Sequence, residues 1–171
     1  MDSSLTHDEI ISKQKEIAKK HKDVQTCYRW NFSEFDGPVR DNTVFPLMTI
    51  ESPTLQFTNT ESSLFSGYNG AFNILGMDGV YTNDVSDEEA INKVLNNSLE
   101  IALEVCKKLI EIDGVYMLET GIKNKWYSSI DKLSFQLTQI GPVTSNYLYG
   151  YRCEFKISTP FSTKLNPDKW Q

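Results

Sequence analysis

The chain has 171 residues, 39% of them hydrophobic, which is enough to bury one core without disulfides or metals, so we expect a single domain over residues 1–171. The net charge of −6 disfavours nucleic acid as the main partner, because affinity for phosphates comes chiefly from clustered Lys and Arg. The charge is uneven: residues 44–114 carry −8 and residues 115–171 carry +3. This asymmetry indicates either head-to-tail association of identical copies or a scattered, solvated surface.

The first predicted element is a helix over residues 6–22. Thr6 and Glu9 have the spacing of a capping box, a thin apolar stripe follows, and lysines occupy most of the remaining surface. We expect the helix to lie on its own domain or, alternatively, on an acidic partner. Both histidines, His7 and His21, fall in this helix without a companion cysteine, so metal binding is not expected.

Aromatic residues alternate in the next segment. Tyr28, Trp30 and Phe32 predict a short strand with one aromatic face, and Phe35 lies just beyond it. These rings form either a satellite core or a contact with another protein.

Residues 44–52 and 67–77 favour the two strands of a hairpin, joined by a polar connection with no helical period. The second strand is apolar on both faces, which predicts a central position in the sheet. Ser86–Glu89 then has the pattern of a second capping box.

The longest helical pattern runs from Ser86 to Asp113. Its apolar surface spans about 200° when successive residues are placed 100° apart, which is broader than a single sheet covers. We expect the protein's own sheet to cover one side. The second cover is the N-terminal helix or a neighbouring copy.

The last third of the chain predicts a strand edge at Val115–Leu118 and an exposed loop over residues 119–130 that carries Trp126. Residues 133–138 and 149–158 alternate as strands, and the tail over residues 161–171 is loosely held or docked on a neighbour. The predicted fold is α+β: an antiparallel sheet of about four strands packed on one long helix within a core of residues 44–160, with an additional N-terminal helix.

The chain shows no chemical signature. A nucleophile elbow, a phosphate-binding loop and a dinucleotide fingerprint are all missing from the sequence. Cys27, Cys106 and Cys153 form no close pair in sequence, which fits a reducing compartment, and we expect them to be structural. No apolar run has membrane-spanning length, and the first ten residues do not look like a signal peptide. We therefore expect no catalytic residues, cofactor, metal or membrane contact.

The order of these elements, together with three local patterns, resembles small virion proteins of tailed bacteriophages: tail-completion, tail-terminator and neck-ring proteins. The likeness is greatest to ring proteins of crAss-like phages that infect Bacteroides. It covers about two thirds of the chain, while residues 26–35 and 119–130 depart from the pattern. The matching pieces are FPLMTIESP at 45–53, GAFNILGMDGVYTNDVSDEEAINKVLNNSLEIALEVCKKLIE at 70–111 and LYGYRCEFKISTPF at 148–161.

The resemblance implies a structural protein of the virion, assembled in the bacterial host cytoplasm as a homo-oligomeric ring. Such a ring connects portal-side proteins to the tail and surrounds the channel through which DNA passes without sequence-specific binding. An acidic subunit suits that channel, because it does not grip the polyanion. The expected subunit interface comprises Leu99, Leu103, Cys106 and Ile110, whose burial contributes several kcal/mol before ordering costs.

Two other functions fit the same sequence. A monomeric α+β ligand-binding protein or enzyme would have its pocket between the long helix and the sheet, near Tyr149 and Tyr151. A cellular adaptor would use Trp30 and Trp126 as its partner contacts.

Overall fold

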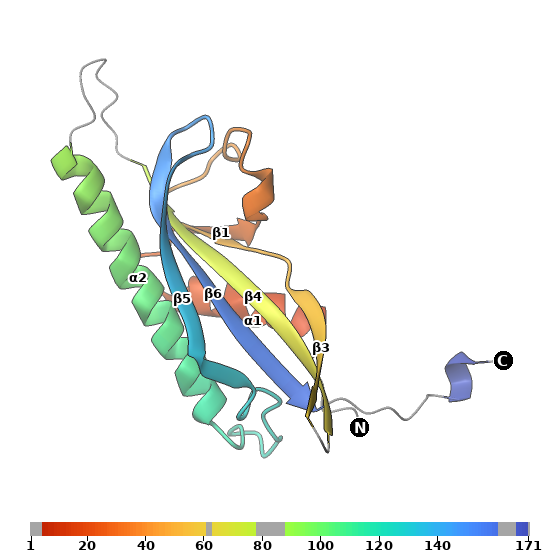
Figure 1. Ribbon diagram of the computed structural model, residues 1–171. Helices are drawn as coiled ribbons and strands as arrows, with labels where there is room; N and C mark the ends of the chain where they lie inside the picture. The colour runs from red at the N-terminus through yellow and green to blue at the C-terminus, as the bar shows by residue number, and fades with distance from the viewer. Residues whose placement is uncertain (1–4, 61–62, 78–87, 161–166, 171) are drawn as a thin grey trace.

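The computed structural model describes residues 5–60, 63–77, 88–160 and 167–170 (Figure 1). A sheet carries two α-helices, and short 3-10 helices lie before β2 and after β6. In chain order the elements are α1 (His7–Lys20), β1 (Thr26–Arg29), η1 (Phe32–Glu34), β2 (Leu47–Ile50), β3 (Thr54–Thr60), β4 (Ser63–Gly76), α2 (Glu88–Gly114), β5 (Ile130–Val143), β6 (Leu148–Pro160) and η2 (Pro167–Lys169).

The sheet is mixed and has six strands in the described part of the chain, in the order β1-β2-β4-β6-β5, with β3 paired to β4 beyond β2. The expected α+β class is confirmed. The prediction of an antiparallel sheet of about four strands is wrong, because β1 runs parallel to β2 and β3 is an additional strand. The strand β4 is central, as its two apolar faces predicted. A parallel pair needs a neighbour brought from elsewhere in the chain, which local patterns do not reveal.

The hairpin is longer than the sequence pattern predicts. The polar connection after residue 52 contains β3, which pairs with β4 from Thr54 opposite Asn69 to Thr60 opposite Ser63. Leu55 and Phe57 remain exposed, as do their neighbours Thr54 and Gln56, so the described start of β3 has no buried face. Backbone pairing with β4 therefore replaces the apolar alternation that sequence analysis relies on.

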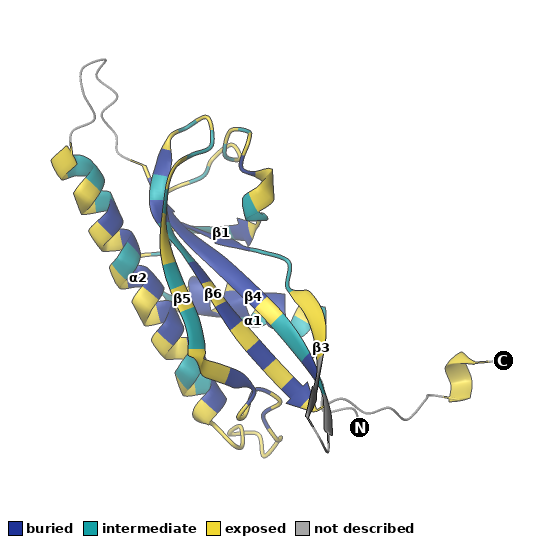
Figure 2. Cartoon of the chain, viewed as in Figure 1, coloured by how far each residue is buried: buried dark blue, intermediate teal, exposed yellow. Residues whose placement is uncertain are grey.

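Both helices cover the same face of the sheet (Figure 1). The helix α1 packs on β1 and β2, and α2 packs on β4, β5 and β6. Figure 2 shows buried and exposed residues alternating along the end of β6, as expected for a strand with one covered face. The main core lies between the layers and includes Met48, Ile50, Phe72, Ile74, Ala102, Leu109, Cys153, Phe155 and Ile157.

A second, smaller core lies elsewhere in the domain. Tyr28 and Phe35 are buried there with Leu47, and the half-buried Trp30 packs against them. The ring centroids of Trp30 and Phe35 are 4.4 Å apart. The aromatic segment therefore forms a satellite core, one of the two alternatives that the sequence left open, but the strand ends at Arg29 and Phe32 lies in η1.

The predicted capping box of α1 is confirmed. Thr6 Oγ1 accepts from the amide of Glu9 at 3.2 Å, and Glu9 Oε2 accepts from the amide of Thr6 at 2.8 Å. The helix ends at Lys20, slightly before the expected boundary, and its apolar stripe is buried in its own domain. Ser86 and Asp87 of the expected second capping box lie outside the described residues, and α2 begins at Glu88.

The last strands are longer than expected. The strand β5 continues through Gly141 and Pro142 with two irregularities in its register, because pairing with β6 tolerates a bulge where local pattern predicts an end. The expected strand edge at Val115–Leu118 is wrong: only an isolated bridge joins Met117 to Lys123. None of the described helices combines the length and apolar character needed to cross a membrane.

Candidate functional site

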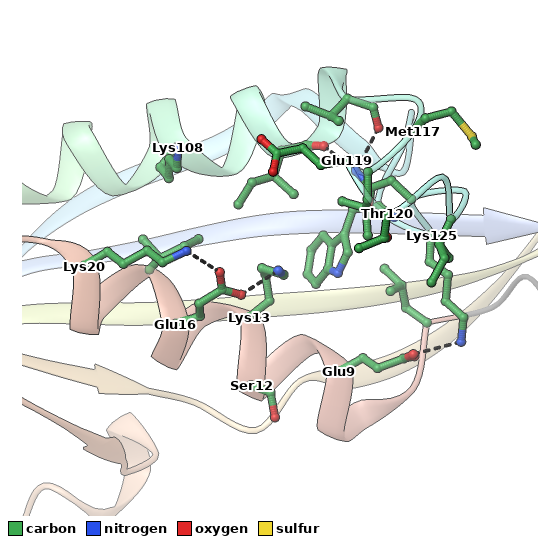
Figure 3. A pocket seen from close by; sticks show the side chains of 18 of the residues that line it. Glu9, Ser12, Lys13, Glu16, Lys20, Lys108, Met117, Glu119, Thr120 and Lys125 are labelled. Atoms are coloured by element: carbon green, nitrogen blue, oxygen red, sulfur yellow. Dashed lines mark hydrogen bonds and ion pairs between the residues drawn. The ribbon is translucent and has the colours of Figure 1, made fainter.

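A groove of about 1180 Å³ runs between α1 and α2 and is closed at one end by the loop over residues 115–126 (Figure 3). Ser12 and Glu16 of α1 line one wall, and Lys108 of α2 lines the other. Leu5, Ile17 and Ile112 contribute apolar surface. We call this feature the interhelical groove.

The interhelical groove does not coincide with the pocket expected between α2 and the sheet. Phe72 and Phe155 are fully buried in that layer, and the sulfur atoms of Cys106 and Cys153 are 3.5 Å apart there. Tyr151 packs against the main core, and Tyr149 is half-buried. The described space near the two tyrosines is therefore occupied by core side chains.

Trp126 lines the interhelical groove and is only 4% exposed. Residues 119–130 were expected to form an exposed loop, with the Trp126 indole as a partner contact. The buried indole contradicts the expected exposure of Trp126. The loop turns inward at this point, because the main core still has apolar area to cover beyond the end of α2. Trp30 lies in the second core, half-buried.

Hydrogen bonds hold the loop that closes the groove. The Asn124 side-chain amide donates to the carbonyls of Ile112 and Val115, both at 2.8 Å, and so satisfies acceptors at the end of α2. Asn124 Oδ1 accepts from the Trp126 amide at 3.0 Å. The buried Asp113 carboxylate accepts from the Ile130 amide at 2.8 Å, which fixes the start of β5. These hydrogen bonds therefore hold the loop in one defined conformation at the end of the groove.

Charges on the rim are paired with one another. Lys13 and Lys20 both donate to Glu16, at 2.6 and 2.7 Å, and these hydrogen bonds lower the pKa of the Glu16 carboxyl to about 2. Lys125 donates to Glu9 at 2.8 Å and links the loop to α1. Burial alone would raise the pKa of Glu9, but hydrogen bonds from Lys125 and Thr6 outweigh it and lower the pKa.

The same loop displays apolar side chains to solvent. Ile122 is 64% exposed, and five other large side chains between residues 115 and 127 are also exposed: Val115, Tyr116, Met117, Leu118 and Tyr127. Such a dense group of exposed apolar residues marks an interaction surface. The sequence indicated only Trp126 of this segment as a partner contact, although the apolar run from Val115 to Leu118 also signalled an exposed surface.

A second candidate surface is the flank of α2 turned away from α1. Leu99, Leu103 and Ile110 share this flank by helical spacing, and Leu103 is 43% exposed while the other two are half-buried. We call it the outer flank. The fourth expected interface residue, Cys106, is buried against Cys153 of its own sheet, so its side chain is not presented to a neighbour.

The outer flank lies beside a sheet edge. The strand β5 ends the described sheet on this side, so its second edge carries no described partner strand. Leu133 on β5 is 97% exposed, within the irregular stretch between Asp131 and Gln136. The helix α2 and the strand β5 lie along the same lateral side of the molecule (Figure 1).

No group of three or more His, Cys, Asp or Glu side chains in the described residues has the arrangement of a metal site. No protein-family model matches the sequence. The search of curated proteins likewise finds no match.

Proposed function

We propose that this protein is a structural subunit that assembles into a homo-oligomeric ring at the head–tail junction of a tailed bacteriophage. The phage context rests on the resemblance of three sequence segments. The physical observation that carries the assembly is the outer flank, where Leu103 is exposed and Leu99 and Ile110 are only half-buried, so the chain leaves apolar surface of α2 uncovered.

The two lateral sides of the subunit differ, as assembly into a ring requires. A ring requires two different surfaces on opposite sides of each subunit, so that every copy contacts the next in the same way. The outer flank and the edge of β5, which has no partner strand among the described residues, supply one such side. The strand β1, on which α1 packs, forms the opposite edge of the sheet. Strand edges and apolar helix flanks are surfaces that favour association.

In this proposal the subunit has no enzymatic activity and no cofactor. Its partners are other copies of itself and the portal, neck or tail proteins above and below the ring, and its location is the virion. The net charge of −6 favours a channel wall along which DNA slides during genome ejection.

Native mass spectrometry and electron microscopy of the purified protein test the assembly. We expect closed rings for the natural sequence and a monomer for Leu103→Glu, because a carboxylate on the outer flank would be desolvated by the neighbouring copy. The matched control is Val44→Glu, which introduces the same charge at an exposed apolar residue outside the outer flank and should leave the rings intact.

The phage assignment needs a separate measurement. Mass spectrometry of purified particles from a phage that encodes this chain should detect the protein in a fixed copy number. A monomer at every concentration, together with absence from such particles, would contradict the proposed function.

A further inference from the structure

The segment that follows β6 places a tryptophan in solvent. Residues 167–170 are all exposed, and Trp170 is 67% exposed. Figure 1 shows η2 well away from the sheet and helices. An indole of this size dominates the energetics of a contact once it is buried. We call Pro167–Trp170 the distal segment.

The interhelical groove provides an unfilled apolar surface of suitable size. Its closed end is lined by Met117, Leu118 and Ile122, which are exposed although hydrogen bonds hold their loop in place. A groove of about 1180 Å³ accommodates several residues of an extended peptide. The groove is preformed, so binding of a ligand does not carry the entropic cost of ordering it.

The rim charges narrow the choice of occupant. Five lysines and four glutamates line the groove, and several of them neutralise one another, so it has no strong preference for a polyanion or for an acidic peptide. An apolar side chain on a segment of mixed charge fits better. The distal segment has this composition, with Asp168 and Lys169 beside Trp170.

We propose that the interhelical groove of one copy binds the distal segment of a second copy, with Trp170 against the closed end of the groove. This inference deepens the proposed function, on which it rests, by naming a contact between adjacent subunits. Trp170 is the tenth residue after Pro160, and an extended chain of that length reaches roughly 33–36 Å, which is enough to cross to a neighbour. Each copy then binds the distal segment of one neighbour in its groove and places its own distal segment in the groove of another, as a repeating head-to-tail contact requires.

The first experiment observes Trp170 directly. The full chain is labelled with 5-fluorotryptophan, and the Trp170 signal is assigned by its loss in Trp170→Phe. We expect this fluorine signal to shift as protein concentration rises, and to keep its dilute position at all concentrations in Ile122→Glu, whose carboxylate lies in the groove. Val44→Glu is the matched control and should shift like the natural chain.

Association strength gives the size of the effect. Trp170→Ala should weaken self-association measured by sedimentation by about tenfold or more, since tenfold corresponds to about 1.4 kcal/mol. Tyr147→Ala removes another exposed aromatic ring outside the groove and should leave association unchanged. Equal association constants for the two variants would overturn the proposal.

A mixing experiment separates exchange between copies from docking within one chain. Lys169→Cys and Lys123→Cys proteins are mixed and treated with a short thiol cross-linker, and a product joining the two chains is expected. Lys156→Cys, on an exposed position of β6, should give no such product. A link that forms only when both cysteines are on the same chain would overturn exchange between copies.

The two proposals fail in distinguishable ways. If Leu103→Glu abolishes rings while the Trp170 signal still shifts with concentration, the distal segment binds independently of the outer flank, and this inference is supported. If rings form and the Trp170 signal is unaffected by concentration and by Ile122→Glu, the inference is overturned and the ring remains.

Discussion

The sulfur atoms of Cys106 on α2 and Cys153 on β6 lie 3.5 Å apart in the main core, although 47 residues separate them in the chain. This contact sets how closely the helix approaches the sheet at its middle. It also assigns Cys106 to the inner side of α2 and leaves Leu103, three residues earlier, on the outside.

Enlarging Cys106 should therefore destabilise the domain. Cys106→Leu adds volume against β6 and should lower the free energy of unfolding by about 1–3 kcal/mol. Lys107→Leu makes the same side chain at the next, exposed residue and should change it by less than about 0.5 kcal/mol. Urea denaturation followed by circular dichroism at low protein concentration measures both, and equal midpoints would contradict the assigned packing.

The thiols should be unreactive in the folded protein. Burial raises the pKa of the Cys27 thiol to about 11, so at pH 8 only about one molecule in a thousand carries the thiolate. Cys106 and Cys153 are shielded by the core, and the neighbouring Cys106 thiol together with burial raises the pKa of Cys153. Iodoacetamide at pH 8 should label three cysteines rapidly only in urea; rapid labelling of native protein would show that the core is open.

The pair formed by Glu51 and Arg152 should contribute to stability. The carboxylate accepts from Arg152 Nε at 2.7 Å and from a terminal guanidinium nitrogen at 3.0 Å, and it is largely buried. Glu51→Gln should cost about 1–3 kcal/mol, because it leaves a partly buried guanidinium poorly paired. Glu154→Gln removes an exposed partner of the same arginine and should cost less than about 1 kcal/mol. Thermal and urea unfolding of the two variants should separate them.

Replacing Trp126 tests whether this residue is a core side chain or a partner contact. Trp126→Ala should reduce the free energy of unfolding by about 3–5 kcal/mol, as expected for a buried indole. Trp30→Ala should cost less, since Trp30 is only half-buried. A folded Trp126→Ala protein of unchanged stability that loses one specific partner would instead favour the adaptor hypothesis.

Acid should weaken the contacts of Glu16. Its pKa in the folded protein is about 2, below the ordinary value of 4.5, so the pairing with Lys13 and Lys20 stabilises the fold above pH 4.5 and is lost as pH falls toward 2. Carbon NMR should place the titration of this carboxyl near pH 2. Because Glu16 is 45% exposed, salt screens the pair, and adding salt should move the pKa upward. A midpoint of 4.5 at low salt would contradict the pairing.

Local patterns predicted the elements that depend on nearby residues. The capping box of Thr6 and Glu9, the central strand β4 and the end of α2, which was expected at Asp113 and lies at Gly114, could each be inferred from spacing alone. Those features need only contacts within a turn or alternation along one strand. The strand β3 escaped prediction because it pairs with β4 through its backbone, while residues 54–57 are exposed and give no buried face.

The candidate site was harder to infer, because it depends on which sides of the elements meet. Helical spacing put Leu99, Leu103 and Ile110 in one expected interface, which stays a prediction, yet it also included Cys106, which is buried where α2 meets the sheet. The interhelical groove combines residues from α1, α2 and the loop between α2 and β5, so no local pattern contains it.

The sequence by itself determined the class of the fold, most of the elements, the broad apolar surface of α2 and the absence of a recognisable catalytic motif, since these follow from residue type and periodicity. Only the tertiary structure decided that α1 and the sheet share the burial of α2, that Trp126 turns inward and that Leu103 stays outside. The reason is that periodicity identifies the apolar side chains that must be buried, whereas packing among segments distant in the chain decides which residues bury them.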